Sequence, residues 1–147
     1  MIFIYDRNEN QIATLNEVYK FTREIGKFNT LEFETDIDIE KGYRAVIIRE
    51  GKAFEFIVID SEYTRDDLKK FSYYCQDSLT EIQGNIILDK RPEGNFEKAL
   101  NVVLEGTRWT LRVEPDYNQS VIFKNSFYRI SSLEAFTKVV EQYNIEW

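Results

Sequence analysis

The sequence predicts an α+β protein in which antiparallel strands come first and two helices come late. Aromatic residues make up 15% of the 147 residues, a share that suits pleated sheets better than helix bundles. Short segments of alternating apolar and polar residues, separated by turn-forming residues, fill about the first 90 positions. Two apolar stripes with helical spacing follow after residue 95.

The first four predicted strands are short. Residues 1–5 and 11–15 are strand-like on either side of the polar turn at 8–10. Alternation then predicts strands over about 18–25 and 30–37, the second with one apolar and one acidic face. A charged connection follows the fourth strand.

The clearest hairpin comes next. Residues 43–49 and 53–59 are rich in apolar and aromatic residues, and they flank a short loop in which Gly51 can adopt positive φ. The polar residues 61–67 are expected to loop outward. The aromatic-rich residues 68–75 predict a further strand.

A domain boundary is expected near residue 90. Residues 77–83 have the spacing of a short helical segment, and 86–88 form a short apolar run. Charge and both turn formers, proline and glycine, are concentrated in 89–94. We therefore predict a β-rich domain at 1–90 and an α/β unit at 91–147.

The first helix is expected over about 96–105. Its apolar stripe consists of Phe96, Ala99, Leu100, Val103 and Leu104. Asn95 precedes the stripe as a candidate N-cap, and Gly106 follows it as a candidate left-handed stop. A strand is expected after the helix, with Trp109, Leu111 and Val113 on its apolar side.

The second helix is expected over about 132–143, after a turn at 114–118 and a short strand at 120–124. Ser131 and Glu134 have the spacing of a capping box. Leu133, Phe136, Val140 and Tyr143 form its apolar stripe. Asn144 is a candidate stop, and a strand is expected from residue 145 to Trp147. A chain that ends just inside a strand is expected to be part of a longer protein.

Composition excludes several classes of function. The chain has no histidine, which removes Ser-His and Cys-His dyads and nearly every catalytic zinc site. Its one cysteine, Cys75, lies in a predicted strand, where a lone thiol is usually a small buried hydrophobe. A single cysteine also excludes an internal disulfide and fits a reducing compartment. The net charge of −7 disfavours a general nucleic-acid binder, and no apolar stretch approaches the length of a membrane span.

The carboxylates do not form a chemical motif. Asp36, Asp38 and Glu40 are spaced as in a calcium loop, but the glycine and the distal glutamate of that motif are missing. Other carboxylates, such as Glu32 and Glu55, alternate with apolar residues, as on the wet face of a strand. We therefore predict no catalytic, cofactor-binding or metal-binding residue. A pair of carboxylates for general acid/base chemistry stays open as an alternative.

One family resemblance lies in the last third of the chain. The residues that carry it are Ala99, Leu100, Leu104, the segment Gly106-Thr107-Arg108-Trp109 and the segment Ser131-Ser132-Leu133-Glu134-Ala135-Phe136. A helix, this glycine-to-tryptophan segment, a strand and a second helix in this order resemble the N-terminal region of siphophage tail-tip proteins. That family is often labelled prophage tail endopeptidase. The predicted strands and the hairpin of the first half are of the same kind as those of that family.

The resemblance implies a structural role in a virion. It implies an antiparallel β-barrel-like hub domain followed by a smaller α/β unit, assembled as a homotrimer when full-length. Such a baseplate hub would sit at the tail tip, close the tail tube and dock on the distal tail protein and tail tube proteins. It would be made in the cytoplasm of the bacterial host. The acidic excess is expected to lie partly on the surface facing the tail channel, where like charge would repel DNA.

The resemblance also bears on chemistry. Any peptidoglycan hydrolase activity is expected in a downstream domain, so this region is not expected to be an enzyme, to hold a cofactor, to bind nucleic acid specifically or to insert into a membrane. Two alternatives stay open, both within a phage tail: a cell-wall-degrading enzyme and a saccharide-binding module. Exposed aromatic residues would favour the second, although most aromatics here lie at positions typical of a core.

Overall fold

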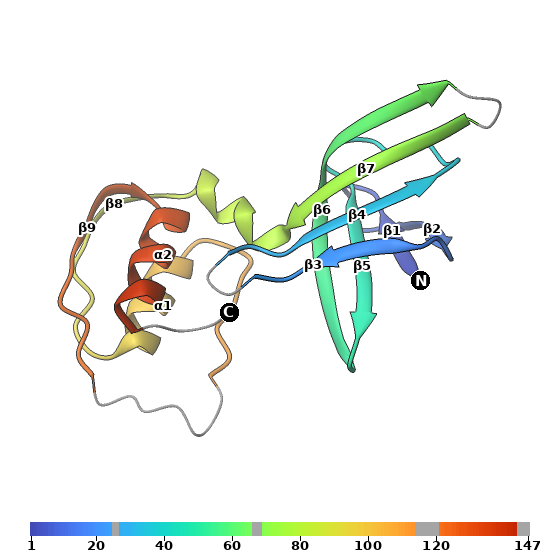
Figure 1. Cartoon of the computed structure of the whole chain (residues 1–147). Helices are drawn as coiled ribbons and strands as arrows, with labels where there is room; N and C mark the ends of the chain where they lie inside the picture. Colours follow the sequence, from blue (N-terminus) through green and yellow to red (C-terminus); the bar gives the residue numbers. More distant parts are fainter. Residues whose placement is uncertain (25–26, 66–68, 114–120, 144–147) are drawn as a thin grey trace. The chain divides into compact units, whose positions relative to one another are not determined.

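The computed structural model describes residues 1–24, 27–65, 69–113 and 121–143 (Figure 1). Contacts divide the chain into two compact units, Met1–Ser78 and Leu79–Trp147. The first unit is built from strands, and the second contains both α-helices beside a small sheet. The predicted α+β class is therefore confirmed.

The first unit is one antiparallel sheet of seven strands in the order β2-β1-β5-β6-β7-β4-β3. Its strands are β1 (Ile2–Tyr5), β2 (Gln11–Leu15), β3 (Tyr19–Thr22), β4 (Thr30–Thr35), β5 (Arg44–Arg49), β6 (Lys52–Arg65) and β7 (Lys69–Asp77). The sheet curls into a half-barrel. Phe21 on the edge strand β3 contacts Phe54 on β6, three strands away in the sheet, with ring centroids 5.1 Å apart.

The long strand β6 allows this curl. Its first half pairs with β5 and its second half with β7, and the register against β7 shifts between Val58 and Asp60. Ile59 is the extra residue of this β-bulge. Bulges bend a strand and increase its twist. Figure 1 shows β6 bending along its length.

The predicted polar loop at 61–67 is wrong, because β6 continues to Arg65. The polar residues Ser61 and Glu62 alternate across the strand, and β7 supplies a partner for each of them. Tyr63 lies opposite Phe71, with ring centroids 5.1 Å apart. A polar composition predicted a loop here, but the ladder with a neighbouring strand overrides local propensity.

The concave face of the half-barrel holds the core of the first unit. Its buried members are Ile2, Ile4, Leu15, Leu31, Phe33, Ile39, Ala45, Ile47, Phe56, Val58, Tyr73 and Cys75. Most occupy alternate positions of their strands, as expected for a sheet with one face covered. The hairpin between β5 and β6 turns through Glu50 and Gly51, both with positive φ (52° and 73°), which is the geometry that two-residue hairpin loops favour.

Tyr73 anchors the charged connection between β4 and β5 to this core. Its hydroxyl accepts a hydrogen bond from the Ile39 backbone N–H at 2.7 Å and donates one to the Ile37 carbonyl at 3.1 Å. Within the connection Ile39 is buried, whereas its neighbours Asp38 and Glu40 are exposed. Burial is the largest cause that raises the pKa of Tyr73.

We expect Tyr73→Phe to lower the free energy of unfolding by about 1–3 kcal/mol, because the Ile39 N–H loses its acceptor while it remains buried. Urea unfolding followed by circular dichroism measures the change. Tyr5→Phe is the matched control, because the Tyr5 hydroxyl makes only an exposed contact with Gln11 at 3.4 Å. Equal effects of the two substitutions would contradict the role assigned to Tyr73.

The second unit packs two helices beside a two-stranded antiparallel sheet. Its elements are the 3-10 helix η1 (Ser78–Gly84), which begins at the last residue of the first unit, then β8 (Ile86–Lys90), α1 (Phe96–Leu104), β9 (Phe127–Ser131) and α2 (Ser132–Tyr143). Residues 86–90 lie in this unit because β8 pairs with β9, and Ile82 and Ile87 enter its core. The division by contacts thus falls after Ser78, whereas the sequence suggested a boundary at residue 90.

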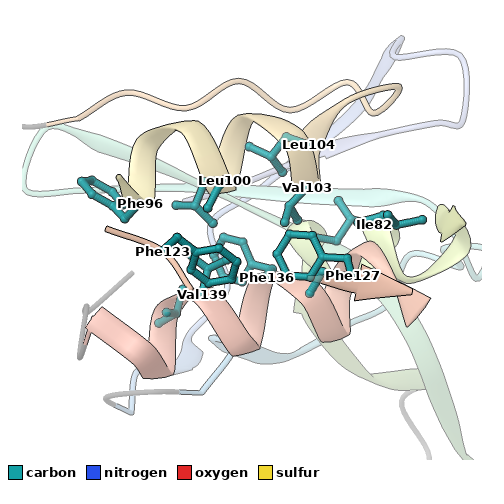
Figure 2. Packing of buried hydrophobic residues seen from close by; sticks show 13 residues of the cluster. Ile82, Phe96, Leu100, Val103, Leu104, Phe123, Phe127, Phe136 and Val139 are labelled. Atoms are coloured by element: carbon teal, nitrogen blue, oxygen red, sulfur yellow. The ribbon is translucent and has the colours of Figure 1, made fainter. Parts of the chain in front are cut away.

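Both helices form where their apolar stripes predicted them. The Asn95 side chain accepts a hydrogen bond from the Lys98 N–H at 3.2 Å, as an N-cap should. Gly106 follows α1 with φ of +79°, and the Ser131 hydroxyl accepts a hydrogen bond from the Glu134 N–H at 3.1 Å. Figure 2 shows the side chains that meet between the helices, among them Leu100 and Phe136.

Two predicted strands of this unit are wrong. Residues 109–113 form no ladder in the described structure, because β8 and β9 pair with each other. Their alternation is nevertheless kept: Trp109, Leu111 and Val113 pack against the core. Residues 121–124 are likewise no strand, and only Phe123 among them is buried. The turn predicted at 114–118, the stop at Asn144 and the strand predicted at 145–147 lie outside the described residues.

Candidate interaction surfaces

Cys75 is no candidate nucleophile. It lies in β7 with its side chain fully buried, as the sequence analysis expected of a structural cysteine. Burial raises the pKa of its thiol to about 12, so almost no thiolate exists at neutral pH. Because the thiolate is the reactive form, this environment makes the side chain inert.

The carboxylates considered in the sequence are mostly held in ion pairs or exposed. Glu32 pairs with Lys20 at 2.8 Å, and this contact raises the pKa of Lys20. Glu55 pairs with Arg44 on the neighbouring strand. Asp36, Asp38 and Glu40 lie exposed on the connection before β5. Within the described ranges, no group of three or more cysteine, aspartate or glutamate residues could hold a metal ion.

An acidic hollow lies over the convex face of β3, β4, β7 and the second half of β6. Its volume is about 1230 Å³. Its charged lining consists of Glu17, Glu32, Glu34, Asp36, Asp60, Glu62, Lys20 and Lys70. Asp60 also accepts a hydrogen bond from Lys41 at 2.7 Å, which lowers the pKa of the aspartate. Six carboxylates against two lysines make this half of the convex face negative.

The other half of the convex face carries mostly apolar side chains around one ion pair. We define the outer apolar face by five residues of β1, β5 and the first half of β6: Phe3, Val46, Ile48, Ala53 and Ile57. Phe3 lies opposite Val46, and Ile48 lies opposite Ala53. Ile48 is 59% exposed. The Arg44–Glu55 ion pair lies on the same face, with side chains only 20% and 29% exposed.

A second apolar patch occurs on the sheet of the second unit. Ile86, Leu88 and Tyr128 are 57%, 71% and 60% exposed. Phe127 is buried while its neighbour Tyr128 points outward, and the positive φ of Arg129 (+49°) interrupts this alternation, so that Ile130 also packs against the core. The Arg129 guanidinium lies 5.3 Å from the centre of the Tyr128 ring.

Sequence reasoning named no site residues and missed these surfaces. The signal for the outer apolar face was present, because the runs 45–48 and 56–59 are apolar at every position. Which side of the sheet is convex depended on the strand order, which local patterns do not contain. Neither helix in the described parts of the chain is long and apolar enough to cross a membrane.

Two solved structures share the fold of this chain. Prophage tail protein gp18 from Listeria monocytogenes EGD-e matches with a TM-score of 0.74 at 12% identity, over 99% of this chain and 46% of that one. A tail protein from Neisseria meningitidis MC58 matches with a TM-score of 0.69 at 9% identity, over 99% and 46%. The chain therefore spans less than half the length of either protein. No known family profile and no curated protein matches the sequence.

Proposed function

We propose that this chain is a structural component of a phage or prophage tail. The observation that carries the proposal is the fold match over 99% of the chain with tail proteins from two different bacteria. The resemblance of the segments 106–109 and 131–136 to tail-tip proteins supports the same role from the sequence. The localisation that follows is the virion.

We further propose the hub at the tail tip as its position. There the full-length protein would form a homotrimer, close the tail tube and dock on the distal tail protein and tail tube proteins. The acidic hollow over β3, β4, β6 and β7 supports a surface that faces the channel, because its excess of carboxylates would repel the DNA backbone during passage. In the described residues β2 and β3 end the sheet, so both are edges available to neighbouring proteins.

The test is a deletion of the coding sequence in the bacterium that carries it, followed by electron microscopy of induced particles. We expect particles with defective or missing tails, and restoration by the full-length gene. Gold-labelled antibodies against residues 1–147 should bind at the tail tip of complemented particles. Normal tails after deletion would overturn the tail role, and labelling along the whole tube would overturn the tip position alone.

We also propose that these 147 residues contribute structure rather than catalysis. Support comes from the absence of histidine in the sequence and from the burial of Cys75. Zymography of the purified chain on bacterial cell walls should give no clearing band, and a band would favour a cell-wall-degrading enzyme. A saccharide-binding module has less support, because Tyr63 and Tyr128 are the only exposed aromatic residues in the described ranges and lie in different units.

A further inference from the structure

We propose that the two units of this chain are separate cooperative units, so that the second unit can unfold and refold while the first stays folded. The inference concerns the chain itself and does not depend on the proposed tail function. Its support lies in the membership of the two cores, in the pairing of the strands and in the path of the chain.

Each unit has a hydrophobic core of its own. The core of the first unit is drawn from positions between Ile2 and Cys75, and the core of the second from positions between Ile82 and Val140. Among the described residues, none belongs to both cores. Burial of apolar surface is the dominant favourable term in folding, and a segment with its own core can in principle fold alone. Damage to one core therefore leaves the driving force of the other in place.

Strand pairing follows the same division. The strands β1 to β7 pair with one another in one sheet, and β8 pairs with β9 in a second sheet. The first unit contains the whole of the larger sheet, and the second unit contains the whole of the smaller one. Loss of the β8–β9 ladder would thus take no hydrogen-bonded neighbour away from any strand of the first unit.

The segment that enters the second unit is fastened within that unit. The Arg108 guanidinium pairs with Glu81 on η1 at 3.0 Å. The Asn85 side chain, between η1 and β8, donates hydrogen bonds to the Ser132 hydroxyl at 2.8 Å and to the Glu105 carbonyl at 3.2 Å. These contacts tie residues 81–85 to the end of α1 and the start of α2. The segment Gly106-Thr107-Arg108-Trp109, which carries much of the family resemblance, thus takes part in holding the second unit together.

The chain passes from one unit to the other once, between Ser78 and Leu79. Unfolding of a segment inserted within another unit would leave a long loop, and the surrounding unit would have to hold the two ends of that loop together at a cost in entropy. In this chain, unfolding of residues 79–147 leaves no such loop inside the first unit. Cooperative opening of one contiguous segment is therefore compatible with an intact first unit.

The chain contains a natural reporter for each unit. Both tryptophans, Trp109 and Trp147, belong to the second unit, so tryptophan fluorescence follows that unit. The one cysteine, Cys75, is fully buried on β7, so its protection from DTNB follows the first unit. The two signals can be recorded on the same full-length sample without any added label.

The test is a urea titration of the 147-residue chain with both reporters. Phe127→Ala removes a fully buried ring from the second core, and it should lower the fluorescence midpoint by at least about 1 M. The midpoint for exposure of Cys75 should stay within about 0.3 M of wild type. Phe56→Ala is the matched substitution, because Phe56 is fully buried on β6 of the first unit. It should lower the Cys75 midpoint and leave the fluorescence midpoint within the same margin.

Val103→Ala, a smaller deletion in the second core, provides a titration curve even where Phe127→Ala unfolds the second unit without urea. A second unit that is unfolded in buffer while Cys75 stays protected would support the inference. Equal shifts of both midpoints in these variants, or loss of Cys75 protection together with the fluorescence change, would overturn it. None of these results bears on the tail role, which the deletion experiment judges separately.

Discussion

Phe127→Ala is expected to lower the free energy of unfolding of the second unit by about 3–5 kcal/mol, the usual cost of removing a large buried aromatic side chain. Phe127 is fully buried on β9, and its ring centre lies 5.4 Å from that of Phe123. Figure 2 shows the Phe127 ring within the cluster that both helices cover. The substitution therefore opens a cavity at the centre of this core. Denaturant unfolding followed by circular dichroism measures the loss.

The neighbouring residue provides the control. Tyr128 is 60% exposed on the same strand, so Tyr128→Ala should change stability by less than about 1 kcal/mol. The contrast between two adjacent aromatic residues tests whether Phe127 and Tyr128 face opposite sides of β9. Equal losses from the two substitutions, or a larger loss from Tyr128→Ala, would contradict the orientation of β9 described above.

At pH 8, Cys75 in the folded chain is expected to react with a disulfide reagent such as DTNB more slowly than in guanidinium chloride, on the order of a thousandfold. Burial raises the pKa of the thiol from 9.0 to about 12, and a difference of three units lowers the thiolate fraction by about that factor. Restricted access to the buried sulfur slows the reaction further. Rapid labelling of the folded chain would show that β7 opens or that Cys75 is exposed.

The same pKa shift predicts how stability depends on pH. The unfolded thiol loses its proton near its ordinary pKa, whereas the folded thiol keeps it up to about pH 12. The folded state therefore binds more protons in this window, and stability should fall as pH rises from about 9 toward 12. Cys75→Ala should show a shallower fall over this window. An identical slope in the two chains would contradict the shift.

The sequence predicted most elements because their patterns are local. The stripe from Phe96 to Leu104, with Asn95 before it and Gly106 after it, contains a whole helix and both of its ends. Strand pairing is different, because a ladder needs a partner elsewhere in the chain. Residues 109–113 have the alternation of a strand without a partner strand in the described structure, and polar residues 61–65 became a strand because β7 lies beside them.

Strand β9 was not predicted from the sequence, for a related reason. In β9 the positive φ of Arg129 breaks the period of two, so Phe127 and Ile130 face the core from positions that no simple alternation connects. The surfaces were harder to predict from the sequence than the strands. The apolar runs of β5 and β6 are visible in the sequence, but the curl that makes one side concave and the other convex depends on the order of all seven strands.

The extra residue at Ile59 specifies shape without specifying any contact. Val58 lies opposite Cys75 and Asp60 opposite Tyr74, so a chain without Ile59 could keep every one of these pairs and keep each side chain on its own face. What it would lose is the local bend of β6, and with it the approach of Phe21 to Phe54 across the half-barrel. The curvature of the sheet therefore depends on the number of residues in β6, whereas folding is driven by the apolar pattern. Deletion of Ile59 alone is expected to flatten the sheet without unfolding it.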